Sequence, residues 1–176
     1  MSKKLVVFYS WSGYTGKVAA YICERTGADL LELQVNEDEY PRTYHQCVSR
    51  VAKQGKGYEP ALVNPLPNLT VYDTVFVGSP CWWGTISGPL RSFLHQNDLS
   101  GKTIAPFMTH GTSGLRLLEI ETLCPDSRIT RGLGIFNSYQ VSNPENSVSN
   151  LGDYKALVDA WLVQIEVEIW LSGNGR

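Results

Sequence analysis

The 176-residue sequence lacks the signatures of several common classes of protein. Its four cysteines form no CxxC pair and no zinc-binding pattern, which favours a reducing, cytoplasmic compartment: Cys23, Cys47, Cys81 and Cys124. A formal net charge of -2 leaves no basic excess, so we expect no nucleic-acid partner. No stretch approaches the roughly 20 apolar residues of a membrane span, so we expect none.

Several nucleotide-binding and catalytic motifs are also missing. A P-loop needs GxxxxGK(S/T), but Gly16 and Lys17 are followed by Val18, and Trp11 stands where the first glycine belongs. The same tryptophan breaks the dinucleotide fingerprint GxGxxG. The chain has no GxSxG elbow of a serine hydrolase and no cluster of carboxylates or histidines. We therefore expect no metal ion, and no residue is identified as a catalytic acid, base or nucleophile.

Alternating strand and helix patterns account for most of the chain. Apolar runs predict five strands, at residues 5–9, 30–35, 74–77, 103–109 and 128–135. Amphipathic spacing predicts five helices, at residues 16–26, 41–54, 88–96, 113–123 and 151–171. A polar loop is expected at residues 136–150. The alternation predicts one α/β domain over residues 1–176, a three-layer, doubly wound sandwich whose five-stranded parallel sheet is covered on both faces.

The last predicted helix is rich in large apolar residues. Leu157, Trp161, Ile165 and Ile169 recur every four residues and predict one apolar face. Trp161 and Trp170 could belong to the core or to a dimer face, so the sequence leaves the oligomeric state open.

Three loops contain unusual residue types, and each follows a predicted strand at its carboxyl end. The first spans residues 10–15, the second residues 79–85 and the third residues 109–114. In a doubly wound sheet, ligands bind outside the carboxyl ends of the strands, where the strand order reverses. This common location is the main support for a functional role of the three loops.

The first loop places hydroxyl groups and a glycine between a strand and a helix. Such a corner can hold a phosphate through free backbone N–H groups and the positive end of the helix dipole. Ser10, Ser12 and Thr15 would supply donors, and Gly13 would let the backbone approach closely. The alternative is an ordinary helix-capping turn, because serine, threonine and glycine are common at helix starts.

The second loop contains two adjacent tryptophans. A planar aromatic ligand could stack on Trp82 or Trp83, although one of the two could instead pack on the helix below. Gly84 would allow a neighbouring peptide to adopt two conformations. Cys81 is expected to be a packed thiol rather than a nucleophile.

The glycines and hydroxyls of the third loop suit backbone donation to a polar ring edge. His110, within this loop, could lie near developing negative charge, or it could be a hydrogen-bonded loop residue, which is the favoured interpretation.

Together the three loops resemble those of the flavodoxin family, whose members bind FMN. Residues 10–15 match the family's phosphate loop, Ser/Thr-x-Ser/Thr-Gly-x-Thr, at every fixed position. Residues 80–85 are similar to a branch with a Pro-x-Trp-Trp-Gly-Thr loop, and residues 106–114 to the third loop of that branch. The resemblance covers nearly the whole chain. It implies FMN as cofactor, a flavodoxin-like sheet of order 2-1-3-4-5, and a short-chain form without an insertion in the fifth strand.

The resemblance also assigns the cofactor-binding residues. The first loop would hold the phosphate of FMN, the second would border the flavin ring, and the third would cover its pyrimidine end. These residues are Ser10, Trp11, Ser12, Gly13, Tyr14, Thr15, Ser79, Pro80, Cys81, Trp82, Trp83, Gly84, Thr109, His110, Gly111, Ser113 and Gly114. Thr112 and Arg116 depart from the branch, where glycines are common, and leave the path of the third loop open.

The resemblance implies electron transfer through bound FMN to a redox partner protein. Electron carriers of the family usually surround FMN with carboxylates, but the three loops contain no Asp or Glu. We therefore predict that the second electron is added at a less negative potential than in a typical carrier. This would also suit an FMN-dependent oxidoreductase that passes electrons from NAD(P)H to a quinone or similar acceptor. A non-redox flavin-fold binding module is a third possibility, so the sequence leaves open whether the chain is an enzyme.

Overall fold

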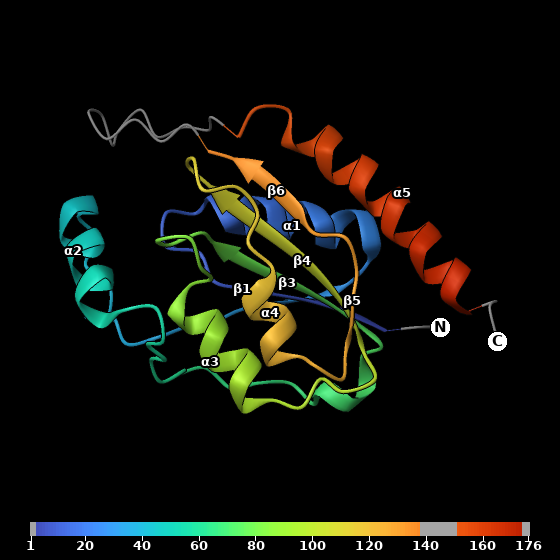
Figure 1. Ribbon diagram of the computed structural model, residues 1–176, viewed down its shortest axis with the longest axis horizontal. Helices are drawn as coiled ribbons and strands as arrows, with labels where there is room; N and C mark the ends of the chain where they lie inside the picture. Colours follow the sequence, from blue (N-terminus) through green and yellow to red (C-terminus); the bar gives the residue numbers. More distant parts are fainter. Residues whose placement is uncertain (1–2, 138–150, 174–176) are drawn as a thin grey trace.

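The sheet of the protein is parallel and has the predicted flavodoxin-like order (Figure 1). The computed structural model describes residues 3–137 and 151–173. The order β2-β1-β3-β4-β5 is built from β1 (Lys4–Phe8), β2 (Asp29–Glu32), β3 (Thr74–Pro80), β4 (Thr103–His110) and β5 (Arg128–Ile129). A further strand, β6 (Leu133–Phe136), also pairs with β4. The carboxyl ends of these parallel strands therefore share one edge of the sheet.

Helices cover both faces of this sheet and complete three layers (Figure 1). Helices α1 (Tyr14–Thr26) and α5 (Tyr154–Gly173) pack together on one face. Helices α3 (Gly88–Gln96) and α4 (Leu118–Leu123), with the short η1 (Leu69–Val71), cover the other face. Helix α2 (Tyr44–Gln54) lies to one side and sends Cys47 into this second core.

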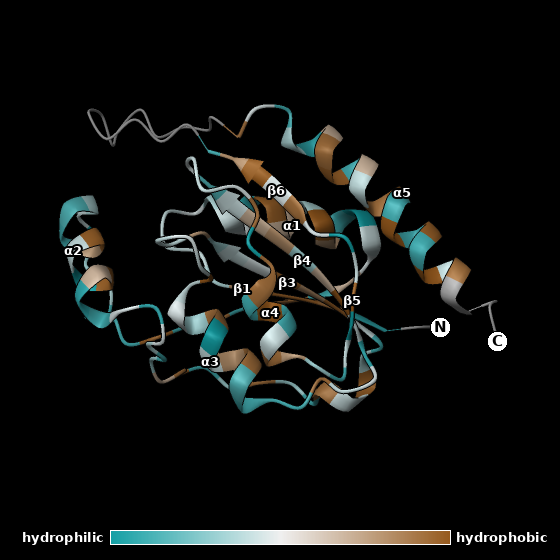
Figure 2. Cartoon of the chain, viewed as in Figure 1, coloured by the Kyte–Doolittle hydropathy of each residue, from teal (hydrophilic) through white to brown (hydrophobic). Residues whose placement is uncertain are grey.

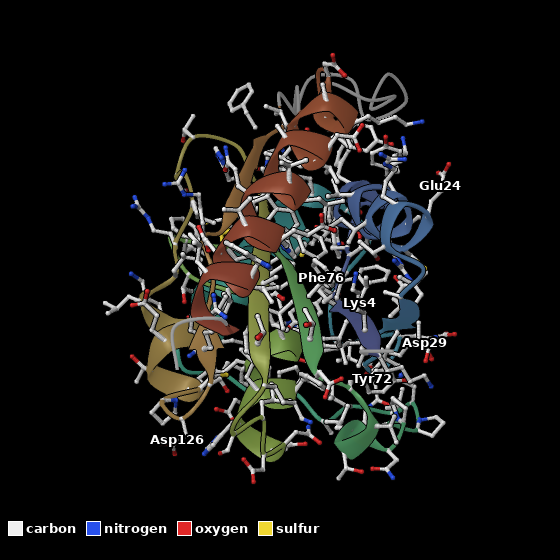
Figure 3. All side chains as sticks on the ribbon, turned by 90° about the vertical axis from the view of Figure 1, so that its right-hand side faces the viewer. Lys4, Glu24, Asp29, Tyr72, Phe76 and Asp126 are labelled. Atoms are coloured by element: carbon white, nitrogen blue, oxygen red, sulfur yellow. The ribbon has the colours of Figure 1, made fainter. Side chains whose placement is uncertain are left out.

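Alternation along β1 explains why two cores form. Leu5 and Val7 belong to the core under α3, whereas Val6 and Phe8 belong to the core under α1 and α5. Phe76 of β3 lies beneath α5, and its ring centroid is 5.8 Å from that of Trp161 (Figure 3). Figure 2 shows the resulting concentration of hydrophobic residues in the centre of the sheet. Burial on both faces is typical of a parallel sheet.

The strand predicted at residues 128–135 is interrupted, which corrects the sequence prediction. Ile104 pairs with Ile129 and Phe107 pairs with Leu133, so three steps along β4 oppose four steps along the outer chain (107 − 104 against 133 − 129). This extra residue is a bulge-like irregularity that separates β5 from β6. A Cβ on Gly132 would lie 2.9 Å from side-chain atoms of Leu115 and Leu117, so the segment between the third loop and α4 packs closely against the interruption.

Several helix boundaries also differ from the predictions. Helix α4 begins at Leu118 rather than at residue 113, because Gly114 has a positive φ of 69° and residues 114–117 run without regular structure. Helix α2 begins at Tyr44 rather than at residue 41, and α1 begins earlier than predicted, at Tyr14. Of the loop expected at residues 136–150, residues 138–150 lie outside the described residues.

The apolar face predicted for the last helix is rotated. Leu157 is 49% exposed, and Val158 is buried in its place. Trp161 and Ile165 are core residues as part of the same face, whereas Trp170 is 64% exposed. The spacing of Val158, Trp161 and Ile165 follows the three- and four-residue steps of an α-helix more closely than strict four-residue steps do.

Candidate functional site

A cavity of about 460 Å³ lies where the three loops meet at the carboxyl ends of β1, β3 and β4. We call it the site cavity. It is lined by residues of all three loops, by one face of α2 and by the residue after β6: Trp11, Ser12, Tyr44, Cys47, Val48, Val51, Pro80, Cys81, Trp82, Trp83, Thr109, His110, Gly111, Thr112, Ser113 and Asn137. The other residues assigned from sequence, which are Ser10, Gly13, Tyr14, Thr15, Ser79, Gly84 and Gly114, lie in the same loops but not in its wall.

The first loop turns from β1 into α1 through a left-handed glycine. Gly13 has φ = 88° and directly precedes Tyr14, the first helical residue. The N–H of Gly16 donates to Oγ of Ser10 over 3.2 Å, and the N–H of Lys17 donates to the carbonyl oxygen of Gly13 over 3.0 Å. No acidic side chain lies in the described first turn of α1. The positive end of the helix dipole at this corner therefore suits an anion.

The remaining side chains of the first loop fix its position. Nε1 of Trp11 donates to the carbonyl oxygen of Pro41 over 3.0 Å and so ties the loop to the segment before α2. Thr15 is buried, and its hydroxyl oxygen is 2.8 Å from that of Thr109 in the third loop. Ser12 is exposed and lines the site cavity. Of the three hydroxyl residues singled out in this loop, Ser12 is therefore the one in the described wall of the cavity.

The two tryptophans of the second loop have different surroundings. Trp82 packs edge-on against Tyr9 and Tyr40, with ring centroids 5.7 and 4.9 Å away. Trp83 is 58% exposed and adopts a left-handed φ of 54°. Trp82 is therefore partly a structural residue, whereas Trp83 presents its indole at the rim of the site cavity.

The turn that carries Trp83 is a tight hairpin. Trp82 and Thr85 exchange backbone hydrogen bonds of 2.9 and 3.1 Å, and the central residues Trp83 and Gly84 have φ values of 54° and 76°. Positive φ at both central positions is characteristic of a type I′ turn, which rarely accommodates a residue as large as tryptophan. Backbone strain at a ligand-binding edge is a common feature of functional sites.

A partly buried ion pair supports this turn from below. Glu119 of α4 accepts hydrogen bonds from Oγ1 of Thr85 and, over 3.4 Å, from the N–H of Ile86. Arg91 of α3 pairs with Glu119 and also donates to Oγ1 of Thr85 over 3.3 Å. Ser79 is likewise a supporting residue, because its buried Oγ accepts the N–H of Ser87 over 2.8 Å. Sequence patterns pointed to none of these partners, which come from separate helices.

In the third loop, His110 is held in its neutral form. Its Nδ1 accepts the N–H of Gly114 over 3.3 Å, which is possible only when that nitrogen carries no proton. Partial burial, with a smaller effect from the nearby charge of Arg116, lowers the pKa of His110. Its ring also meets Phe136 edge-on, with centroids 6.2 Å apart. This geometry agrees with the favoured interpretation of a hydrogen-bonded loop residue.

Sequence reasoning missed two contributors to the site cavity. One face of α2 supplies Tyr44, Cys47, Val48 and Val51, although its amphipathic pattern gave no sign that it would reach the loops. The other contributor is Asn137, whose buried Oδ1 accepts no hydrogen bond from the described part of the chain. A strand end placed at Phe136 would have identified Asn137, because ligands gather at carboxyl ends of parallel strands.

The charges around the site cavity are sparse. Among the described residues, no carboxylate lines it, and His110 is neutral. Burial raises the pKa of the Cys47 thiol to about 11, so this pocket thiol stays protonated at neutral pH. Within residues 3–137 and 151–173, no three His, Cys, Asp or Glu side chains gather as a metal site would require. No described helix combines the length and apolar character needed to cross a membrane.

Comparison with known proteins yields a family match and similar structures. The family model described as Flavodoxin matches residues 3–148. A Bacteroides uniformis protein described as a flavoprotein is 25% identical, with a TM-score of 0.73 over 92% of this chain and 98% of that chain. A flavoprotein of Lactobacillus acidophilus, solved in complex with FMN, is 24% identical, with a TM-score of 0.67 over 76% of this chain and 93% of that chain. These likenesses agree with the sheet order and layers described above.

Proposed function

The chain belongs to the flavodoxin family, and on this premise we propose that it binds FMN in the site cavity and transfers electrons through it. The observation that carries the proposal is the meeting of all three predicted loops at one cavity. When bound, FMN supplies the one- and two-electron redox chemistry, while the protein binds it, orients it and sets its surroundings.

The residues present fit the chemical groups of FMN. The corner formed by Gly13 and the amino end of α1 offers backbone donors and a helix dipole to a phosphate. The exposed indole of Trp83 offers a flat apolar surface to a ring. Oδ1 of Asn137, which accepts no hydrogen bond from the described residues, is an acceptor that suits the single N–H donor of a flavin pyrimidine. We infer that these three groups bind the phosphate, the ring face and the ring edge.

A redox partner protein is the favoured source or acceptor of electrons, and an oxidoreductase acting on NAD(P)H and a small acceptor is the second candidate. The absence of carboxylates from the described wall of the site cavity favours this second candidate. Negative charge near a flavin opposes its full reduction, so an uncharged wall makes two-electron reduction easier. Oxidation of NAD(P)H by the FMN-loaded protein, measured with a panel of quinones, distinguishes the two. Turnover supports the oxidoreductase, and its absence supports the carrier.

Titration of FMN with the protein tests the proposed binding site. We expect wild-type protein to quench flavin fluorescence on binding, and Trp83→Ala to weaken binding by about tenfold, which corresponds to the upper range for one aromatic contact. Trp170→Ala removes an equally exposed tryptophan on α5 and should leave FMN affinity unchanged. Equal affinities for wild-type and Trp83→Ala protein would contradict the assignment of this indole to the ring, and no uptake of FMN would contradict the proposed function.

A further inference from the structure

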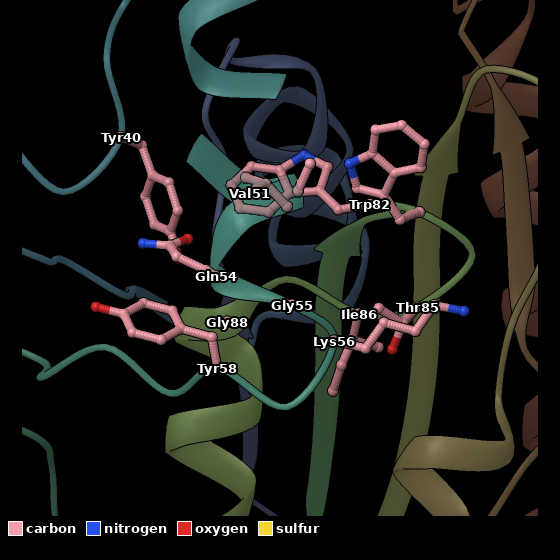
Figure 4. Close-up of a pocket in the computed structure, with 12 residues that line it drawn as sticks. Tyr40, Val51, Gln54, Gly55, Lys56, Tyr58, Trp82, Thr85, Ile86 and Gly88 are labelled. Atoms are coloured by element: carbon pink, nitrogen blue, oxygen red, sulfur yellow. The ribbon is translucent and has the colours of Figure 1, made fainter. Parts of the chain in front are cut away.

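A second, smaller cavity of about 240 Å³ adjoins the site cavity (Figure 4). It lies between the end of α2, the segment that follows α2 and the second loop. Trp82, Trp83 and Val51 line both cavities, so the two share a wall. We call the smaller one the aromatic cavity. Its volume is below the roughly 300–1,000 Å³ of pockets for drug-sized ligands, which limits an occupant to one or two rings.

Four of the twelve residues that line the aromatic cavity carry aromatic rings: Tyr40, Tyr58, Trp82 and Trp83. Figure 4 shows the rings of Tyr40 and Tyr58 on one side, with Ile86 and Thr85 facing them. The ring of Tyr40 meets Trp82 at a centroid distance of 4.9 Å and an interplanar angle of 66°. Flat aromatic and aliphatic walls select planar apolar ligands over sugars or extended polar chains.

Close packing fixes the position of the Tyr40 ring. A Cβ on Gly88 would lie 2.8 Å from the Tyr40 hydroxyl and 2.9 Å from Cδ of Pro60, so any larger residue would displace this wall. Tyr40 is only 4% exposed, and its burial strongly raises the pKa of its hydroxyl. The ring is therefore a rigid, uncharged wall at ordinary pH.

Glu39 and Lys56 are the charged groups that matter most at the aromatic cavity in the described part of the chain. Glu39 accepts hydrogen bonds from Nε2 of Gln54 over 2.6 Å and from the Tyr58 hydroxyl over 2.8 Å. This carboxylate therefore already engages the polar ends of two lining side chains. Lys56, in contrast, is exposed at the cavity and forms no ion pair with the described residues. Among the described residues that line the cavity, Lys56 is the one with a charged side chain, whereas the carboxylate of Glu39 lies behind Gln54 and Tyr58.

From the ring walls and this lysine, we propose that the aromatic cavity binds a planar aromatic carboxylate of one or two rings. The rings would lie between Tyr58 and Ile86, beneath Trp82, and the carboxylate would face the ammonium group of Lys56. The proposal goes beyond FMN binding and does not depend on it, because the walls are complete in the protein alone. An occupant would touch Trp82 from the side opposite to the site cavity.

Isothermal titration of the FMN-loaded and FMN-free protein with 2-naphthoate tests this proposal. We expect binding in both forms, weakened about tenfold by Lys56→Gln because one charge-assisted contact is lost. Lys53→Gln is the matched control, since Lys53 is exposed in the last turn of α2, just before Lys56, and does not line the cavity. Ala52→Trp, at an exposed lining position, should fill the cavity and abolish binding.

The location and the charge preference have separate readouts. The amide resonances of Gly55, Lys56 and Gly88 should shift on addition of 2-naphthoate, whereas those of Gly111 and Ser113 should not. The neutral analogue 2-naphthylmethanol should bind about tenfold more weakly than the carboxylate. No heat of binding at millimolar 2-naphthoate, equal binding of the neutral analogue, or shifts confined to the third loop would each overturn the proposal. Failure of FMN to bind would leave these results unaffected.

Discussion

The hydroxyl oxygens of Thr15 and Thr109 lie 2.8 Å apart in the interior, although the two residues are 94 positions apart in sequence. Thr15 is 1% exposed and Thr109 is 4% exposed, so neither hydroxyl can exchange this partner for water. The bond fixes the first loop against the third at the base of the site cavity. The corner proposed for the phosphate and the loop proposed to cover the pyrimidine ring are thereby held at a constant separation.

Removal of one of these hydroxyls should destabilise the protein. In Thr109→Val, the Thr15 hydroxyl stays buried without its partner, and we expect the free energy of unfolding to fall by about 1–3 kcal/mol. Urea denaturation followed by circular dichroism measures the change. Thr112→Val serves as the control, because Thr112 is exposed in the same loop and its loss should leave stability nearly unchanged.

The double variant Thr15→Val/Thr109→Val separates this bond from general packing effects. Once both hydroxyls are gone, no buried group remains unpaired, so the combined loss should be smaller than the sum of the two single losses. Strictly additive losses would show that the two hydroxyls do not interact.

The turn at Trp83 and Gly84 makes a second prediction possible. Gly84 has φ = 76°, and a Cβ there would meet nothing within 4 Å, so only backbone strain opposes a side chain. Gly84→Ala should therefore cost about 1–2 kcal/mol of unfolding free energy. Gly111→Ala is a matched control with equally open space, and Gly111 is not among the glycines with positive φ. The melting temperature of Gly84→Ala should lie below that of Gly111→Ala. Equal melting temperatures would contradict a left-handed Gly84.

Local patterns in the sequence predicted the strands and most helix positions. The resemblance to flavodoxins predicted the sheet order. The local patterns did not predict the interruption between β5 and β6, because it depends on Leu115 and Leu117 packing against Gly132. They also extended α4 too far toward its amino end, since the left-handed conformation of Gly114 and its bond to His110 are tertiary features. Boundaries of this kind are set by contacts between distant segments, which periodicity does not contain.

Prediction of the site was uneven for a similar reason. The loops were identified because strand ends are readable from the sequence and carry distinctive residues such as Trp83. The face of α2 that lines the cavity was missed, because the fold rather than the helix pattern decides where Cys47 and Val51 point. Glu119 beneath Thr85 was missed because the pair comes from two segments that meet only in the folded chain.

The pKa of His110 predicts a loss of stability at mildly acidic pH. This pKa is lowered below its ordinary value of 6.5 by partial burial and by Arg116, so below pH 6.5 the unfolded chain takes up the proton first. The free energy of unfolding should therefore fall as the pH drops below 6.5 and level off once the folded protein also binds the proton. Protonation also breaks the bond from the Gly114 N–H to Nδ1.

Denaturation measured from pH 7.5 to 5 checks this prediction, with His110→Gln as the test variant. The decrease in unfolding free energy below pH 6.5 should disappear in that variant. It should persist in His45→Gln, which alters an exposed histidine on α2. If His110→Gln retained the wild-type decrease, another group would be responsible for it.

The uncharged wall of the site cavity leads to a prediction about reduction potentials. Thr112 is exposed and lines the cavity, so Thr112→Asp would place a carboxylate beside the proposed position of the flavin ring. Added negative charge opposes uptake of the second electron by bound FMN, and we expect that potential to become more negative by on the order of 50 mV relative to Thr112→Asn. The shift should shrink at high salt, because ions screen an exposed charge. If the difference in potential between the two variants did not change with salt concentration, it would indicate a changed loop conformation. Equal potentials in the two variants would place the ring away from the third loop.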